Sequence, residues 1–272
     1  MLKRWQAVRF GGVLENGRTK PMILECLEIG DSIVIDPDAA KPPARREFVV
    51  KALGNPEVDQ SYITKELLGN LLARRYGLNT PEPAIVVISD AFVRAVNPRL
   101  QGYGYQIRPG AAAGCEYFRG GFSFPPAEAL LSEDELAQMA QLYGFDLAVQ
   151  NPDRLPIRPN CALKGGRLIA FDFDSCFSFL YVIGAVGEAW EVSKHGIAPT
   201  HLCHRRLQAK KDVVTWQGNK VAVSALSNEV LGNLTSWIAD KWSVNASTVC
   251  THVAAIRDHV DAFEMELQGS VA

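Results

Sequence analysis

The 272-residue chain lacks the sequence marks of several protein classes. Its 28 Lys and Arg balance 30 Asp and Glu, so neither charge is in the excess expected of a nucleic-acid coat or an acidic tail. No apolar run is long enough to span a bilayer, and the first residues contain no signal-peptide core. We therefore expect a cytoplasmic protein with no membrane span and no direct contact with nucleic acid.

Cysteine is sparse and scattered along the chain. The six cysteines form no C-x-x-C pair and no disulfide framework, so we expect reduced thiols. The one concentration of metal-type side chains is His201, Cys203 and His204, which has no second pair at zinc-finger spacing. We interpret it as a surface segment with scattered histidines.

Several catalytic signatures are also absent. The chain contains no G-x-x-x-x-G-K-[ST], no H-E-x-x-H and no G-x-S-x-G. Residues 102–104 begin like a dinucleotide-binding fingerprint, but its third glycine is missing. The sequence therefore gives no support for a Walker-type NTPase, a zincin, a serine hydrolase of the G-x-S-x-G type or a Rossmann enzyme.

The pattern of apolar residues changes along a chain of ordinary globular composition, with 47% apolar and 21% charged residues. One helix is expected from Ile63 to Tyr76, and a capping box at Ser132–Glu135 opens another. Strands are expected at 5–14, 22–27, 47–53, 84–88 and 102–107, a short hairpin around 164–167, and two final helices near 227–242 and 246–267.

A Gly/Ala-rich stretch at 109–114 is typical of a break between two regions. The residues before it are mostly β and those after it mostly helical. We therefore expect an α+β fold with two lobes, a β-rich N-lobe at 1–107 and a helical C-lobe at 108–272.

Three oxygen-bearing side chains stand out in the second half. Asp153 lies in a proline-rich loop, Asn160 precedes the short hairpin, and Asp172 ends an apolar strand. Hard oxygen ligands of this kind suit Mg²⁺. Because Asp and Asn are also common turn formers, the pattern alone leaves a metal site and ordinary loop structure both open.

Lys51 and Glu66 are the corresponding pair in the first half. Lys51 ends an apolar strand, where an ammonium is costly without a partner, and Glu66 follows within the amphipathic helix. A strand lysine facing a helix glutamate can hold nucleotide phosphates. An edge-strand lysine and a solvated helix face remain the alternatives.

Five short motifs in order resemble the HipA-like kinases, particularly short bacterial HipA-like proteins, and more distantly the phosphatidylinositol kinases. They are similar to G-[RST]-[ST]-x-P, Y-V-V-K-x-x-G-N-P, E-L-L-A-x-x-L-A-x-x-L-G-L-P-x-P-E, N-x-D-R-x-x-x-N-P-N and I-D-F, and lie at 17–21, 48–56, 66–83, 151–160 and 171–173. The resemblance implies a protein-kinase-like fold and ATP- and Mg²⁺-dependent phosphoryl transfer, with a Ser or Thr of a protein as acceptor.

The resemblance also implies a role for each motif residue. Asp153 would be the catalytic residue that orients or deprotonates the acceptor hydroxyl, and Asn160 and Asp172 would bind Mg²⁺. The nucleotide would be bound by Lys51 and Glu66 at its phosphates, by the covering turn Gly17, Arg18 and Thr19, and by Gln106 and Ile107 at its adenine.

The chain departs from the family at one important position. Arg158 stands five residues after Asp153, where related kinases have a metal-binding asparagine. An arginine repels Mg²⁺, although it can turn towards phosphate instead. A nucleotide-binding pseudokinase that serves as a binding or regulatory module is therefore one alternative, and a small-molecule or lipid kinase is another.

Overall fold

The computed structural model describes residues 2–15, 18–29, 43–118, 124–125, 129–182, 184, 187–236 and 245–272. The chain divides into two compact units. The first consists of Met1–Leu67 and Pro81–Arg119, and the second of Leu68–Thr80 and Gly120–Ala272. Helix α1 (Gln60–Arg75) contributes residues to both.

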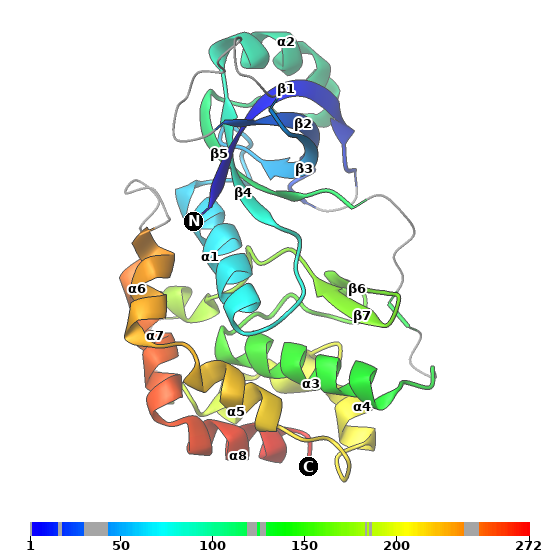
Figure 1. Ribbon diagram of the computed structural model, residues 1–272, viewed down its shortest axis with the longest axis vertical. Helices are drawn as coiled ribbons and strands as arrows, with labels where there is room; N and C mark the ends of the chain where they lie inside the picture. The colour runs from blue at the N-terminus through cyan, green and yellow to red at the C-terminus, as the bar shows by residue number, and fades with distance from the viewer. Residues whose placement is uncertain are drawn as a thin grey trace. The chain divides into compact units, whose positions relative to one another are not determined.

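The first unit is built on a closed barrel of five strands in the order β1-β2-β3-β5-β4 (Figure 1). All neighbours pair antiparallel except β1 and β4, which run parallel. The strands are β1 (Lys3–Val13), β2 (Met22–Ile29), β3 (Arg45–Lys51), β4 (Pro83–Ile88) and β5 (Gly110–Glu116).

This closure corrects the predicted fold class. We expected a protein-kinase-like N-lobe of antiparallel strands, and that expectation is wrong because the strands close into a barrel that includes a parallel pair. The register of β1 shifts between Ala7 and Arg9 and again between Phe10 and Gly12. Such irregularities bend and twist a strand. They allow the first residues of β1 to pair with β4 while the strand pairs with β2 along its length.

Large apolar side chains fill the barrel. The rings of Trp5 and Phe48 lie 4.9 Å apart at their centroids, and both side chains are buried. Helix α2 (Asp90–Leu100) and the 3₁₀ turn η1 (Gln101–Tyr103) follow β4. The buried face of α2 belongs to the same core, so this helix extends the barrel interior.

Residues 110–114 of the Gly/Ala-rich stretch, where we expected a break in structure, belong to strand β5 of the first unit. A Cβ at Gly114 would lie 2.8 Å from the Val86 side chain on β4. Small residues therefore allow β5 to fit between its neighbours, which explains why the segment lacks the bulky residues typical of strands. The domain boundary between 107 and 108 stays a prediction.

The described residues of the second unit are mainly helical and include a two-stranded hairpin. The capping box at Ser132 and Glu135 and the turn at 164–167 are both confirmed. Its elements are α3 (Glu133–Ala148), β6 (Cys161–Lys164), β7 (Arg167–Ala170), η2 (Ser178–Tyr181), η3 (Val192–His195), η4 (Ala198–Thr200), α4 (His204–Ala209), α5 (Gln217–Ser224), α6 (Asn228–Ser236), α7 (Ala246–Asp258) and α8 (Val260–Ser270).

The long helix predicted near 246–267 is interrupted in the structure. It forms α7 and α8, which meet at His259. The other predicted helix is seen as α6, and residues 237–242 of that prediction lie outside the described part of the chain. None of the helices described is both long and apolar enough to cross a bilayer.

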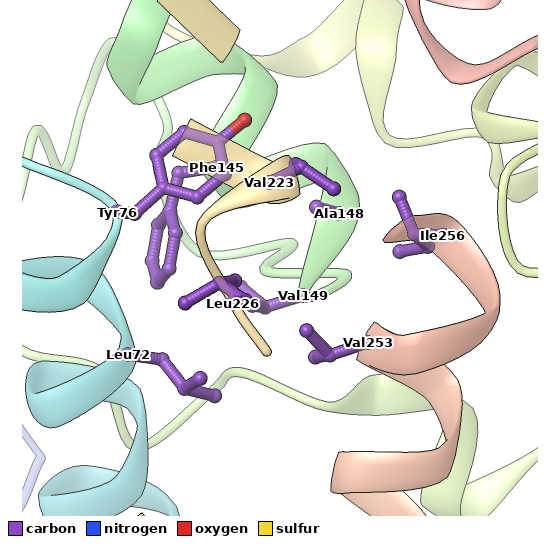
Figure 2. A pocket seen from close by; sticks show the side chains of 9 residues that line it. All are labelled: Leu72, Tyr76, Phe145, Ala148, Val149, Val223, Leu226, Val253 and Ile256. Carbon is purple, nitrogen blue, oxygen red and sulfur yellow. The ribbon is translucent and has the colours of Figure 1, made fainter. Parts of the chain in front are cut away.

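A narrow apolar gap lies within the second unit (Figure 2). Among the side chains that line the gap, the Tyr76 hydroxyl is the one polar group, and it donates a hydrogen bond to Asn219 Oδ1. The gap is therefore a packing feature of the core. It is lined by Leu72, Tyr76, Phe145, Ala148, Val149, Val223, Leu226, Val253 and Ile256.

Candidate functional site

Lys51 and Glu66 form a buried ion pair in the first unit. Lys51 Nζ lies 2.8 Å from Glu66 Oε2, and the two side chains are 9% and 8% exposed. Lys51 is the last residue of β3, and its ammonium also lies 5.1 Å from the ring centroid of Tyr62 on α1. The structure thus pairs the two side chains that the sequence singled out, whereas their binding of phosphates stays a prediction.

The expected phosphate-covering turn is held by a neighbouring segment. Gly17 lies outside the described residues. Arg18 Nε forms an ion pair with Glu57 Oε2 at 2.8 Å, and the carbonyl of Thr19 accepts a hydrogen bond from Asn55 Nδ2 at 2.7 Å. Residues 55–57 therefore fix the position of Arg18 and Thr19.

Asn55 is the centre of these contacts. Its side chain is buried, and its Oδ1 accepts a hydrogen bond from the backbone N–H of Glu57 at 3.0 Å. A further contact runs from the Tyr105 hydroxyl to the carbonyl of Lys20 at 2.8 Å. The turn is consequently linked to the segment after β3 by an ion pair and a hydrogen bond, and to the segment after α2 by a neutral hydrogen bond.

The segment expected to meet adenine has part of its backbone already bonded. The Ile107 N–H donates to Asn97 Oδ1 at 2.9 Å, and Asn97 Nδ2 donates to the Ile107 carbonyl at 3.1 Å. Gln106 is exposed beside it. Gly54, with φ of 100°, allows the Gln106 carbonyl to approach closely, because a Cβ there would lie 2.8 Å from that oxygen.

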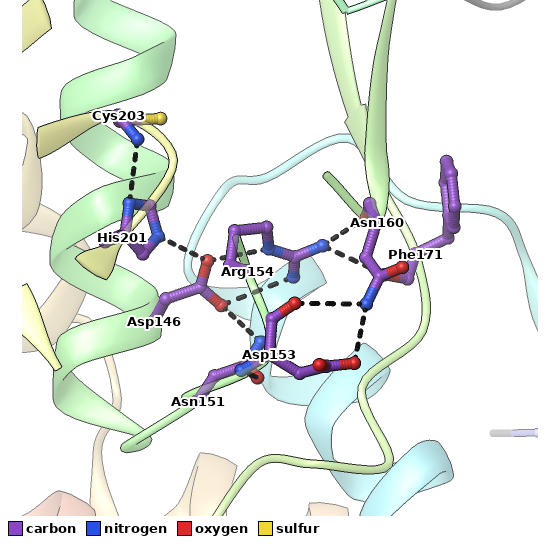
Figure 3. A network of polar contacts seen from close by, with 8 residues as sticks. All are labelled: Asp146, Asn151, Asp153, Arg154, Asn160, Phe171, His201 and Cys203. Carbon is purple, nitrogen blue, oxygen red and sulfur yellow. Dashed lines mark hydrogen bonds and ion pairs between the residues drawn. The ribbon is translucent and has the colours of Figure 1, made fainter. Parts of the chain in front are cut away.

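The Asp153 carboxylate in the second unit contacts two donors, Arg158 and Asn160, of which Figure 3 shows Asn160. Arg158 Nη1 lies 2.6 Å from Asp153 Oδ1, and Asn160 Nδ2 lies 3.1 Å from Asp153 Oδ2. The backbone N–H of Asp153 donates to Asn151 Oδ1 at 3.2 Å. The carboxylate, whose side chain is 19% exposed, is thus held in one orientation at the start of the loop.

The two expected metal residues share an unusual backbone conformation. Asn160 has φ of 46° and Asp172 has φ of 64°. Left-handed conformations are uncommon outside glycine, although Asn and Asp adopt them more readily than other residues, and they occur often at functional sites. The amide of Asn160 and the carboxylate of Asp172 supply oxygen donors, so their chemistry fits a Mg²⁺ ion.

A buried network beside Asp153 was not predicted from the sequence. Asp146 on α3 accepts hydrogen bonds from Arg154 Nε at 2.8 Å, from Asn151 Nδ2 at 2.8 Å and from His201 Nε2 at 3.0 Å. The side chains of Asp146, Arg154 and His201 are all fully buried. The interpretation of the segment around His201 as surface is therefore wrong for His201 and for the equally buried Cys203.

Arg154 connects the segments that bear the expected site residues. Its Nη1 donates to the carbonyls of Asn160 and Phe171, the latter at 3.0 Å (Figure 3). One guanidinium thus joins α3, the loop of Asp153 and the residue before Asp172. The signal in the sequence was Asp146 itself, because a carboxylate on the apolar face of a helix needs a buried partner.

The charges of this network are set by burial and by its hydrogen bonds. Burial alone would raise the pKa of Asp146, but the charge of Arg154 and the hydrogen bond from His201 hold it below its ordinary value. Burial lowers the pKa of His201 despite Asp146. His201 Nδ1 accepts the N–H of Cys203 at 3.1 Å, so the neutral ring carries its proton on Nε2.

Comparison with known proteins finds similarity in structure but not in sequence. No protein-family model matches the chain, and no curated protein matches it in sequence. Among solved structures, the chain is similar to the Helicobacter pylori proinflammatory kinase CtkA, with a TM-score of 0.48 and 9% identity over 97% of this chain and 99% of that chain. A likeness of this degree leaves the role of each residue to be argued from its own contacts.

Proposed function

We propose that the protein catalyses ATP- and Mg²⁺-dependent phosphoryl transfer to a Ser or Thr of a protein. The observation that carries this proposal is the buried pair of Lys51 and Glu66. Removing two charges from water costs several kcal/mol per ion, and a buried pair rarely repays that cost in stability. A lysine held by a helix carboxylate at a strand end is, however, well suited to pairing with nucleotide phosphates.

The first unit would supply the nucleotide contacts. Lys51 pairs with the phosphates and Glu66 fixes the lysine, while the turn that contains Gly17, Arg18 and Thr19 covers them. Because the peptide groups of Ile107 are bonded to Asn97, recognition of the adenine edge falls to Gln106. Ile107 supports Gln106 from within the core, where it is buried.

The second unit would supply the transfer chemistry. Asp153 accepts the hydrogen bond of the acceptor hydroxyl and takes its proton, and Asn160 and Asp172 would hold Mg²⁺. When bound, Mg²⁺ neutralises charge that develops on the phosphates. The protein contributes positioning, because Asn160 fixes the Asp153 carboxylate and Arg154 fixes the loop that bears it.

One contact favours a second candidate, a nucleotide-binding pseudokinase. Arg158 stands at the position of the metal-binding asparagine of related kinases, and it pairs with the proposed base Asp153 at 2.6 Å. A base that stayed covered would give binding without transfer. The two candidates differ in whether ADP and phosphorylated protein form from bound ATP.

Calorimetry of ATP binding with and without Mg²⁺ tests the nucleotide site. We expect Lys51→Ala to weaken binding at least tenfold, the loss of one charge-assisted contact. Asp172→Ala should remove the dependence on Mg²⁺, whereas Lys164→Ala, an exposed lysine on β6, should bind like the wild type. Wild-type binding by both Lys51→Ala and Asp172→Ala would overturn the proposal.

Asp153→Ala then separates the two candidates. In a kinase it should leave ATP binding nearly unchanged and abolish ADP formation and transfer. If the wild type binds Mg²⁺ and ATP but forms no ADP beyond the Asp153→Ala level with any protein acceptor, the pseudokinase is correct.

A further inference from the structure

The exposed side chain of Arg158 forms an ion pair with Asp153, the proposed base. Its Nη1 lies 2.6 Å from Asp153 Oδ1, and its side chain is 62% exposed against 19% for Asp153. The other oxygen of Asp153 is held by Asn160, whose backbone carbonyl is in turn bonded to the buried Arg154. One oxygen of the base is thus held from the protein interior and the other from the solvent side.

The backbone that carries Arg158 is fixed by a tight hairpin. The N–H of Leu155 donates to the carbonyl of Arg158 at 3.1 Å, and the N–H of Arg158 donates to the carbonyl of Leu155 at 3.0 Å. Pro156 restricts φ within the turn. Movement of Arg158 away from Asp153 is therefore a rotation of its side chain and needs no rearrangement of the loop.

The tip of the hairpin, residues 156–157, directly precedes Arg158, which contacts Asp153. Ile157, at this tip, is 91% exposed and is therefore accessible to a partner. It stands next to a guanidinium whose planar donors suit a carboxylate. Because the Arg158 side chain is largely exposed, its ion pair is weak, and another anion can replace Asp153 as its partner.

We propose that Arg158 selects the acceptor, a Ser or Thr in a protein segment with an acidic side chain beside the hydroxyl. This inference rests on the proposed function and names its substrate class. Without substrate, Arg158 covers Asp153 Oδ1. The acidic side chain of the acceptor draws Arg158 away, Ile157 contacts a neighbouring apolar residue of the segment, and Oδ1 then receives the acceptor hydroxyl.

The reaction that follows balances with ATP as the donor. The acceptor oxygen bonds to the γ-phosphorus while the bond from that phosphorus to the bridging oxygen breaks, and ADP leaves. The hydroxyl proton passes to Asp153 Oδ1. A segment without the acidic side chain leaves Arg158 on Oδ1, so its hydroxyl meets a base that is already paired.

Peptide binding without nucleotide tests the selection directly. The probes are fluorescent peptide pools with a central serine and either Glu or Gln fixed at one flanking position. By anisotropy, the wild type should bind the best Glu pool about tenfold more tightly than its Gln partner, as one charge-assisted hydrogen bond allows. Arg158→Gln should bind both equally, while Arg167→Gln, which removes an exposed arginine from β7, should keep the preference.

Phosphoryl transfer to the same pools gives a second measurement. Arg158→Gln should lose the preference for the Glu pool and phosphorylate the Gln pool faster than the wild type, because nothing covers the base. Arg158→Gln that keeps the preference, or that slows transfer to both pools equally, would overturn the role of Arg158.

The outcomes also separate this inference from the proposed function. If the Lys51→Ala and Asp172→Ala variants both bind ATP as the wild type does, the proposed function fails and this inference fails with it. If ATP binds as proposed but neither pool is bound or phosphorylated, the acceptor is not an acidic protein segment and this inference alone is overturned.

Discussion

Among the residues that the structure describes, two buried ion pairs, Lys51–Glu66 and Arg154–Asp146, differ in how completely the protein encloses them. In the first unit, the Lys51 ammonium contacts one oxygen of Glu66, and the two side chains retain 9% and 8% exposure. In the second unit, the Arg154 guanidinium contacts both oxygens of Asp146, and neither side chain is exposed. The Lys51 ammonium is a compact point charge, whereas the Arg154 guanidinium is planar and presents several N–H donors.

This difference separates a pair that can serve a ligand from one that holds the chain together. The other contacts of Arg154 go to the carbonyls of Asn160 and Phe171, and the remaining contacts of Asp146 go to Asn151 and His201. A closed network of this kind fixes backbone segments. Burial of a charge alone therefore does not identify a ligand-binding residue, because the fully buried pair holds backbone segments together.

Replacing Arg154 should have the largest effect on stability. Arg154→Met leaves the Asp146 carboxylate buried without its main partner, and we expect a loss of about 3–5 kcal/mol in the free energy of unfolding. Urea denaturation measures it. Arg158→Met, which removes an arginine from an exposed ion pair, is the matched control and should cost about 1 kcal/mol or less.

A second variant covers the case in which Arg154→Met does not fold. The double variant Asp146→Leu with Arg154→Met removes both charges, so it should recover part of the lost stability. A loss below about 1 kcal/mol for Arg154→Met would show that the network is not a structural hub.

Replacing Lys51 should destabilise the protein less. Lys51→Met leaves Glu66 with some access to water, and we expect a loss of about 1–3 kcal/mol, the cost of an unsatisfied buried group. The double variant with Glu66→Gln should recover part of it, measured in the same urea experiments. If Lys51→Met and Arg154→Met lower the free energy of unfolding equally, the two ion pairs contribute equally to stability, and the distinction drawn between them is wrong.

Local patterns predicted the elements and the contacts that depend on short stretches of sequence. The capping box of Ser132 and Glu135 and the hairpin turn at 164–167 are each set by a few adjacent residues. The pairing of Lys51 with Glu66 follows from a strand and a helix that are neighbours in sequence. Each could be foreseen because its partners lie within about one supersecondary unit.

Long-range choices could not be foreseen in the same way. Closure of the barrel depends on the parallel pairing of β1 with β4, some eighty residues away, and on irregularities in β1 that leave no clear trace in its sequence. Burial of His201 depends on a carboxylate 55 residues earlier. The roles of Asp153, Asn160, Asp172 and the nucleotide-binding residues stay predictions, because they concern ligands and not the fold.

The smallest effect is expected from protonation of His201. Its pKa in the folded protein is lowered from an ordinary value of 6.5, so the unfolded chain binds the proton more readily. Stability is therefore fully present above about pH 6.5 and is lost as the pH falls below it, by at most about 1.4 kcal/mol per pH unit. Asp146 loses its own contribution only at lower pH, below its ordinary value of 3.8.

The surroundings of His201 explain why it resists protonation. Nε2 faces Asp146 and the charge of Arg154 lies beside it, while Nδ1 already accepts the N–H of Cys203 and the ring packs edge-on against Tyr143. A proton on Nδ1 would break the Cys203 contact. His252 has a pKa lowered to about 4, so acid destabilisation of the wild type has more than one source.

The difference between the wild type and His201→Gln isolates the contribution of His201. Urea denaturation of both proteins between pH 5 and 7.5 gives the difference in their free energies of unfolding. This difference should narrow as the pH falls, because only the wild type must keep this ring neutral. A difference in the free energy of unfolding that stays constant with pH would mean that His201 protonates equally in the folded and unfolded chains, which would contradict its enclosure by Asp146, Cys203 and Tyr143.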